Sequence, residues 1–269
     1  MPYLKMTDGV EIYYEVYGEG QPLVFIHGLG ASCSMYKPQV EYFKPFFKII
    51  LIDLRGNGNS GKLETNIQGV LPKQADDIKQ LLRYLHIKNA LFVGVSYGGV
   101  LIQKLAIVHP EVVRGLIIVD SFCDTSINSI QKLFAMVGAY QTWVLHMPKK
   151  LIANLTKTSY KQWPLASDEM HHIILNMRTK ETKIQRKAVN KVNFTKDLNT
   201  INVPVLCLVG DYTTLGVQMM MQVASCIPNS EMRIIENSFD PSNLCQPEVF
   251  NHLVQNFMVK LDVPADMHK

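Results

Sequence analysis

The chain has 269 residues, of which 47% are hydrophobic and 19% charged, and its formal net charge is +4. This composition excludes a disordered chain and is ordinary for a folded globular protein. A chain of this length can bury one large core, so we expect one catalytic or binding unit.

The N-terminal residues and the cysteines bear on the cellular compartment. Residues 1–8 lack the apolar stretch of a signal peptide, and the uncharged stretches are too short to span a bilayer. Five cysteines at irregular spacing form no C-x-x-C pair, which favours reduced thiols. We expect a cytoplasmic protein with no metal, cofactor, membrane span or nucleic-acid partner. The oligomeric state is left open.

Short runs of Val, Ile and Leu recur along the chain, and such runs are typical of buried parallel strands. Between them, apolar residues recur at helical spacing. This alternation predicts an α/β fold with a mostly parallel central sheet and helices on both faces. The expected strands are 22–26, 48–52, 90–93, 115–119, 203–209 and 232–235, and the clearest helices include 78–85 and 249–257.

The alternation stops after residue 121 and resumes at residue 203. We expect residues 122–196 to form a helical lid over a core made of residues 1–121 and 197–269. The lid sequence carries 12 Lys or Arg against 4 Asp or Glu, and the rest of the chain carries 15 against 19. A solvated helix face explains this excess, and attraction of an anionic ligand is the alternative. The candidate pocket residues of the lid are Phe134, Tyr140 and Trp143.

Two motifs point to chemistry at the ends of strands. Residues 90–99 read as a strand, a G-x-S-x-G turn and a helix, the arrangement that raises a nucleophilic Ser96 above a sheet edge. Upstream, His27 and Gly28 end another apolar strand. The backbone N–H groups of Leu29 and Tyr97 are candidates for an oxyanion hole, and Gly28 is a candidate pocket residue. We expect His27 to support the loop structurally.

These motifs resemble the lid-bearing bacterial α/β-hydrolases that include 3-oxoadipate enol-lactonases, carboxylesterases and C–C bond hydrolases. The resemblance covers the chain outside the lid and implies an α/β-hydrolase fold with a small-molecule substrate. Because the lid varies most in that group, the substrate does not follow. The resemblance rests on His27-Gly28, the D-L-R-G-x-G-x-S stretch at 53–60, the G-x-S-x-G at 94–98 and His109-Pro110.

The resemblance also implies where the partners of the nucleophile belong. The position of the family acid, three residues after the Gly that closes the strand at 203–209, is occupied by Thr213. Counting back from the Pro-Glu pair at 247–248, the histidine position is occupied by Asp240 and the preceding glycine position by Phe239, a candidate pocket residue. The catalytic triad is therefore expected to be incomplete.

Three functions remain open at this point. In the first, an atypical hydrolase uses Ser96 with Asp240 as base or acid and Thr213 as support. An ordinary Asp is a weaker base than His by about 2.6 pKa units, or about 3.5 kcal/mol, unless burial raises its pKa. In the second, the chain binds a small molecule without catalysis. In the third, a conventional hydrolase recruits His252 or one of the lid histidines, which are His146, His171 and His172.

Overall fold

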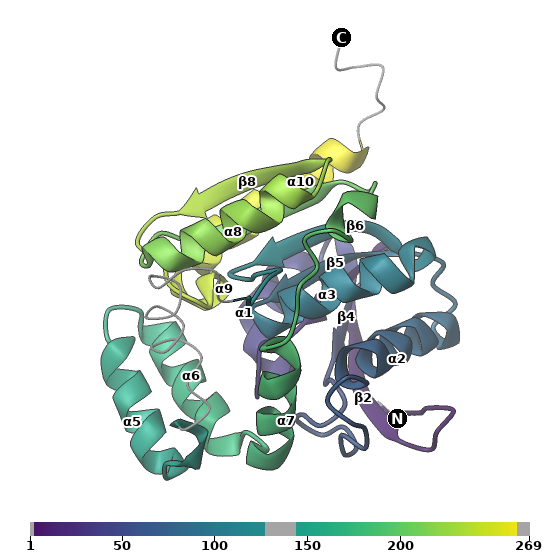
Figure 1. Cartoon of the computed structure of the whole chain (residues 1–269). Coiled ribbons are helices and arrows are strands. Elements are labelled where there is room, and N and C mark those ends of the chain that lie inside the picture. Colours follow the sequence, from purple (N-terminus) through teal and green to yellow (C-terminus); the bar gives the residue numbers. More distant parts are fainter. Residues whose placement is uncertain (1–2, 127–143, 263–269) are drawn as a thin grey trace.

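The computed structural model describes residues 3–126 and 144–262 (Figure 1). Within these ranges eight strands form one sheet in the order β1-β2-β4-β3-β5-β6-β7-β8. The pairs β1–β2 and β2–β4 are antiparallel, and the remaining neighbours are parallel. The strands are β1 (Tyr3–Lys5), β2 (Glu11–Tyr17), β3 (Gln21–Ile26), β4 (Phe47–Ile52), β5 (Ala90–Val95), β6 (Val113–Val119), β7 (Val205–Gly210) and β8 (Ser230–Ile235).

Helices cover both faces of this sheet, and no helix in the described ranges is long and apolar enough to cross a membrane. The α-helices are α1 (Lys37–Phe43), α2 (Val70–Tyr84), α3 (Tyr97–Val108), α5 (Lys149–Ser159), α6 (Pro164–Asn176), α7 (Thr179–Val189), α8 (Thr214–Cys226), α9 (Ser242–Cys245) and α10 (Pro247–Asp262). Short 3-10 helices are η1 (Cys33–Tyr36), η2 (Pro110–Val112), η3 (Val144–His146) and η4 (Leu198–Thr200).

The six expected strands are confirmed with ends shifted by at most two residues. The two expected helices are confirmed as parts of longer ones, because α2 begins eight residues before 78 and α10 ends five residues after 257. The antiparallel pair β1 and β2 lies outside the expected set. Strand β2 is not an apolar run, because it lies near the edge of the sheet: only Ile12 is buried, and its other residues are partly buried or exposed.

The sheet separates two apolar cores, and alternate residues of β5 show this directly. Phe92 packs with residues of α2, α3 and α8 on one face, whereas Leu91 and Val93 pack with α1 and α10 on the other. All six residues of β5 are buried. Because β3, β5, β6, β7 and β8 run parallel, their carboxyl ends meet at one edge of the sheet, where ligand sites of open α/β sheets lie.

The segment between β6 and β7 supplies η3, α5, α6 and α7. These helices lie beside the carboxyl ends of the strands in Figure 1. Helix α6 contacts α9, and Tyr160 and Trp163 at its N-terminal side belong to the same apolar core as α1 and α10.

Candidate active site

Ser96 lies at a strained turn between β5 and α3. Its φ of 53° and ψ of −111° fall where non-glycine residues are rare, which costs on the order of 1–3 kcal/mol. Two hydrogen bonds hold the turn: the Ser96 N–H donates to Val119 O at 2.8 Å, and the Ser121 hydroxyl donates to Ser96 O at 2.8 Å. The expected nucleophile elbow therefore has the geometry of one.

The glycines around Ser96 allow backbone segments to approach closely. A Cβ at Gly94 would come within 2.5 Å of Gly98 O, and a Cβ at Gly98 would overlap Ile26 O. A side chain at either position would force α3 away from β3 or β5. The G-x-S-x-G spacing is thus required by packing as well as by the turn.

Ser96 opens into a cavity of about 250 Å³ at the carboxyl edge of the sheet. Residues from four strand ends and from α7 and α8 line it, so segments far apart in the sequence meet here. The cavity contains three of the expected site residues, Ser96, Thr213 and Asp240, together with the expected pocket residue Phe239. Its other lining residues are Asp120, Ser121, Phe122, Arg186, Val209, Gly210, Leu215, Gly216 and Met219.

Asp240 and Ser96 are partners in this cavity. Both residues are partly buried, and the Ser96 side chain lowers the pKa of the Asp240 carboxyl by hydrogen bonding. Burial, followed by the negative charge of Asp120, raises the pKa of Asp240 to about 8. The hydrogen bond from Ser96 and the charge of Arg186 act in the opposite direction but are weaker. Asp240 therefore holds its proton far more strongly than an ordinary aspartic acid.

Asp120 follows β6 and is held by three donors. Its Oδ1 accepts from the Gly210 N–H at 3.0 Å and the Ser242 hydroxyl at 2.9 Å, and its Oδ2 accepts from the Ser242 N–H at 2.6 Å. Burial raises the pKa of Asp120 to about 6, and the bonds from Ser242 and Gly210 limit that rise. Since Asp120 has the donors, Asp120 is the member of the pair that ionises first and Asp240 the member that keeps the proton.

The loop that carries Asp240 is fixed by aromatic side chains from the segment between β6 and β7. The Tyr160 hydroxyl donates to Asp240 O, and Trp163 Nε1 donates to Asn237 O at 2.8 Å. The rings of Tyr160 and Trp163 also pack on Phe239, with centroids 5.4 and 6.5 Å apart. The position of Asp240 thus depends on residues about 80 positions earlier in the chain.

The loop after β3 lies next to Ser96. A Cβ at Gly28 would lie 4.0 Å from Ser96 Cβ, which places the loop beside the expected nucleophile. The N–H of Tyr97 is at the first position of α3, where no earlier helix carbonyl can accept it. His27 is fully buried, accepts from the Leu54 N–H at 3.0 Å and bonds Gly28 O at 2.8 Å. These contacts fit the structural role expected for His27.

Thr213 caps helix α8. Its hydroxyl oxygen accepts from the Gly216 N–H at 3.2 Å, and the residue lines the cavity. The position expected for the family acid thus holds a side chain that caps the N-terminus of a helix.

None of the seven histidines in the described residues lines this cavity. His252 is exposed on α10 beside the ring of Tyr42, and His146 bonds Lys183 at 3.1 Å on the surface. His172 is exposed and bonds Asn176 on the same helix. The described geometry offers no support for recruitment of a distant histidine.

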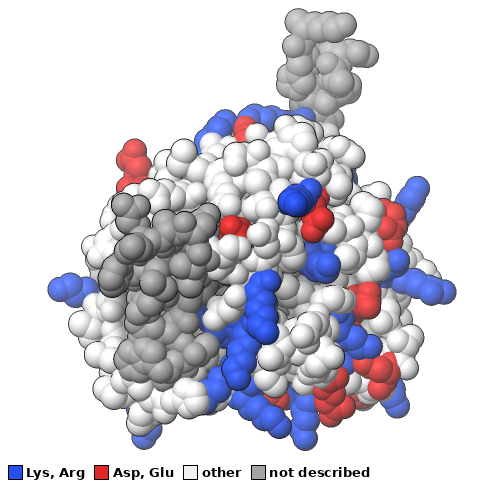
Figure 2. All heavy atoms as spheres, in the orientation of Figure 1, with Lys and Arg blue, Asp and Glu red and all other residues white. Residues whose placement is uncertain are grey.

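Two charged cavity residues, Asp120 and Arg186, are absent from the expected site. The sequence does place Asp120 directly after a buried strand, β6, whose carboxyl end lies at the site. For Arg186 the only signal in the sequence is the excess of basic residues in its segment. Figure 2 shows Lys and Arg side chains gathered on the face where α7 lies. The expected pocket residues Phe134, Tyr140 and Trp143 lie outside the described residues.

A comparison of the chain with models of protein families identifies its family. Residues 21–239 match the family model described as the alpha/beta hydrolase fold. The chain belongs to the α/β-hydrolase family. The match spans the elbow, the segment between β6 and β7 and every residue that lines the cavity except Asp240.

Among curated proteins, this α/β-hydrolase is 24% identical to a putative carbamate hydrolase RutD of Serratia proteamaculans, over 93% of this chain and 96% of that protein. It is 25% identical to 3-oxoadipate enol-lactonase 2 of Acinetobacter baylyi, over 94% and 95%. Among solved structures it resembles a thermophilic esterase from Thermogutta terrifontis, with a TM-score of 0.82, 22% identity and coverage of 97% and 98%. These likenesses support a hydrolase-like enzyme.

Proposed function

We propose that this α/β-hydrolase cleaves a small ester, lactone or carbamate substrate with Ser96 as nucleophile and Asp240 in the place of the family histidine. The observation that carries the proposal is that Ser96, on its strained turn, and Asp240 line one cavity that no described histidine lines. The relatives named for carbamate, lactone and ester chemistry suggest the substrate class.

The raised pKa of Asp240 supplies the basicity that an ordinary carboxylate lacks. With a pKa of about 8, the ionised Asp240 is at least as strong a base as an unperturbed histidine. The cost is that only about a tenth of the molecules carry the ionised form at pH 7. Ser96 therefore has a competent base in a minor fraction of the protein, and that fraction grows with pH.

In the proposed reaction, ionised Asp240 takes the proton of Ser96 as Oγ attacks the substrate carbonyl carbon. The backbone N–H groups of Leu29 and Tyr97 stabilise the oxyanion, and protonated Asp240 returns its proton to the leaving group. Water then repeats the sequence on the acyl-enzyme. Thr213 shapes the wall of the cavity, and the helices of residues 122–196 act as the lid that covers it.

A second function is favoured by the same protonated carboxyl. At neutral pH, Asp240 can donate a hydrogen bond to a ligand carbonyl without reacting, as a binding protein with an inactive nucleophile would require. Arg186 in the same cavity would favour an anionic ligand. This candidate predicts ligand binding without covalent labelling.

Labelling with a serine-directed fluorophosphonate separates the two functions. The wild-type protein is expected to be labelled at Ser96 at pH 8.5, and p-nitrophenyl acetate to be turned over slowly. Both reactions are expected to vanish in Ser96→Ala and to fall at least about 100-fold in Asp240→Ala, because the base is lost. Mass spectrometry of the labelled peptide identifies the site.

Asp211→Ala is the matched control, because Asp211 directly follows β7 at the same edge of the sheet, is exposed, and its carboxylate accepts from the Ser238 N–H. It is expected to keep most of the labelling. Failure of the folded wild-type protein to react at any pH up to 9.5 would reject catalysis by Ser96 and favour the binding function. Equal labelling of Asp240→Ala and wild type would reject Asp240 as the base.

A further inference from the structure

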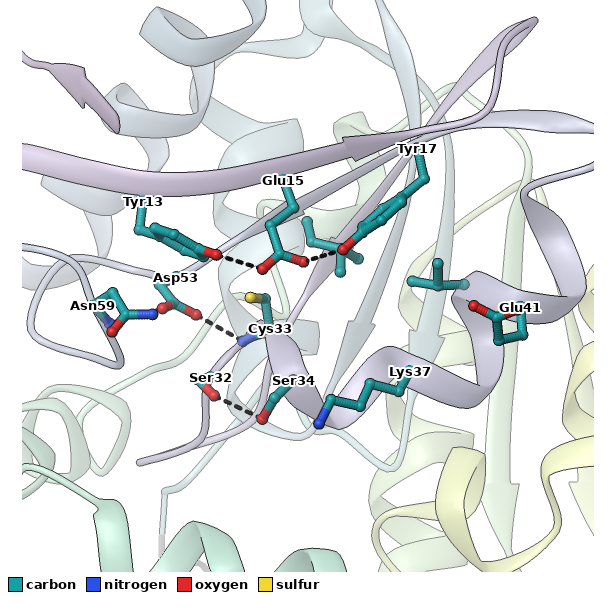
Figure 3. A pocket seen from close by; sticks show the side chains of 12 residues that line it. Tyr13, Glu15, Tyr17, Ser32, Cys33, Ser34, Lys37, Glu41, Asp53 and Asn59 are labelled. Carbon is teal, nitrogen blue, oxygen red and sulfur yellow. Dashed lines mark hydrogen bonds between the residues drawn. The ribbon is translucent and has the colours of Figure 1, made fainter. Parts of the chain in front are cut away.

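A second and larger cavity, of about 460 Å³, lies on the other side of the loop after β3, between β2 and the segment η1–α1. Figure 3 shows Tyr13, Glu15 and Tyr17 on one wall, where they point from the same face of β2. Ser32, Cys33, Ser34 and Lys37 form the facing wall. None of these residues lines the cavity that contains Ser96.

The hydrogen bonds on the β2 wall have one direction. The Tyr13 hydroxyl donates to Glu15 Oε1 at 2.5 Å, and the Tyr17 hydroxyl donates to Glu15 Oε2 at 2.8 Å (Figure 3). Each phenol proton is therefore committed to Glu15, which leaves lone pairs on both phenol oxygens and on the carboxylate. This wall offers acceptors to a ligand and has no side-chain donor left.

The charge of the cavity lining also favours a ligand that donates hydrogen bonds and is positively charged. Its lining contains Glu15, Glu41 and Asp53 against Lys37, a formal charge of −2. Glu41 is already paired with Lys44 at 2.6 Å. The donors to Glu15 are neutral phenols, and those to the fully buried Asp53 are the neutral N–H groups of Cys33 and Asn59.

Cys33 does not give this cavity a nucleophile. Burial and the charge of Asp53 raise the pKa of the Cys33 thiol far above its usual range, so the thiol stays protonated. Lys37 is exposed and lies across the cavity from Glu15 in Figure 3. The cavity thus fits a binding site better than a reactive one.

We infer that this cavity binds a small organic ammonium ion, whose N–H donors meet Glu15 and the phenol oxygens of Tyr13 and Tyr17. The ammonium group brings the donors and the positive charge that the wall lacks, and the aromatic rings and Val40 accept its alkyl chain. The site is independent of the proposed hydrolysis at Ser96.

Three ligands of matched size test this inference: butylammonium, butan-1-ol and butyrate, titrated at pH 7.5 into the full-length protein while NMR chemical shifts are followed. Butylammonium is expected to bind at least about tenfold more tightly than butan-1-ol, and butyrate to bind most weakly. Equal affinities for the ammonium and the alcohol, or no binding of the ammonium, would overturn the inference.

Two carboxylate variants assign the effect to the site. Glu15→Gln keeps an acceptor for one phenol but removes the charge, and is expected to reduce the preference for the ammonium about tenfold. Glu41→Gln removes the same charge from a residue already paired with Lys44, and is expected to reduce it less than about threefold. Equal losses in the two variants would show a general electrostatic effect and overturn the proposed contacts with Glu15.

Discussion

Asp240→His is expected to raise kcat/KM for p-nitrophenyl acetate at pH 7 by about tenfold over wild type. An imidazole has an unperturbed pKa near 6.5 and is mostly in its basic form at pH 7, whereas Asp240 with a pKa of about 8 is mostly protonated. The scaffold is expected to supply the rest: Ser96 in its elbow, the proposed oxyanion-hole N–H groups of Leu29 and Tyr97, and the carboxylate of Asp120, whose charge acts on position 240.

The role of Asp120 in that gain can be separated. In the Asp240→His background, Asp120→Asn is expected to remove most of the gain, because the imidazolium then lacks its nearby anion. Asn tolerates the positive φ of 46° at this position, so the change tests charge more than backbone conformation. If Asp240→His is no more active than Asp240→Ala and melts at the wild-type temperature, the idea that the side chain at position 240 serves as the base of Ser96 fails.

Asp240→Asn is expected to change the pH dependence of stability. The folded protein holds the Asp240 proton up to about pH 8, while the unfolded chain releases it near the ordinary value of 3.8. The native state then binds more protons, so this group makes the unfolding free energy fall as pH rises, by up to about 1.4 kcal/mol per pH unit between these two values. Asparagine does not titrate, so the variant lacks this fall.

Guanidinium unfolding of both proteins at pH 5, 6, 7 and 8 measures the effect. The stability of Asp240→Asn relative to wild type is expected to increase steadily over this range and to level off above about pH 8. Asp8→Asn is the control, because the hydrogen bond from Arg55 holds the pKa of Asp8 well below its usual range and the carboxyl stays ionised throughout. Parallel stability curves for wild type and Asp240→Asn would contradict the raised pKa.

The positions of Ser96, Thr213 and Asp240 could be predicted, Ser96 from its motif and the other two from the resemblance to α/β-hydrolases, and parallel strands bring all three to one edge of the sheet. The contacts that each side chain makes at this edge could not be predicted. Thr213 caps α8. Asp240 lies on a loop that is held by hydrogen bonds from Tyr160 and Trp163. Hydrogen bonds between residues 74 and 80 positions apart leave no local pattern in the sequence.

Arg186 and the second cavity show the same limit in different ways. The approach of Arg186 to Asp240 depends on how α7 docks against the sheet, which residue spacing on the helix does not specify. The second cavity has a local signal, the alternation of Tyr13, Glu15 and Tyr17 on one face of a strand. That pattern indicates the wall of a cavity only once β2 is known to be a strand that faces η1.

The pH dependence of fluorophosphonate labelling at Ser96 tests most directly whether Asp240 serves as its base. The rate in the wild-type protein is expected to rise between pH 6 and 9 with a midpoint near 8, following ionisation of Asp240, and to lose this rise in Asp240→Asn. A midpoint near 6.5 that persists in Asp240→Asn would assign the base to a histidine and contradict the account.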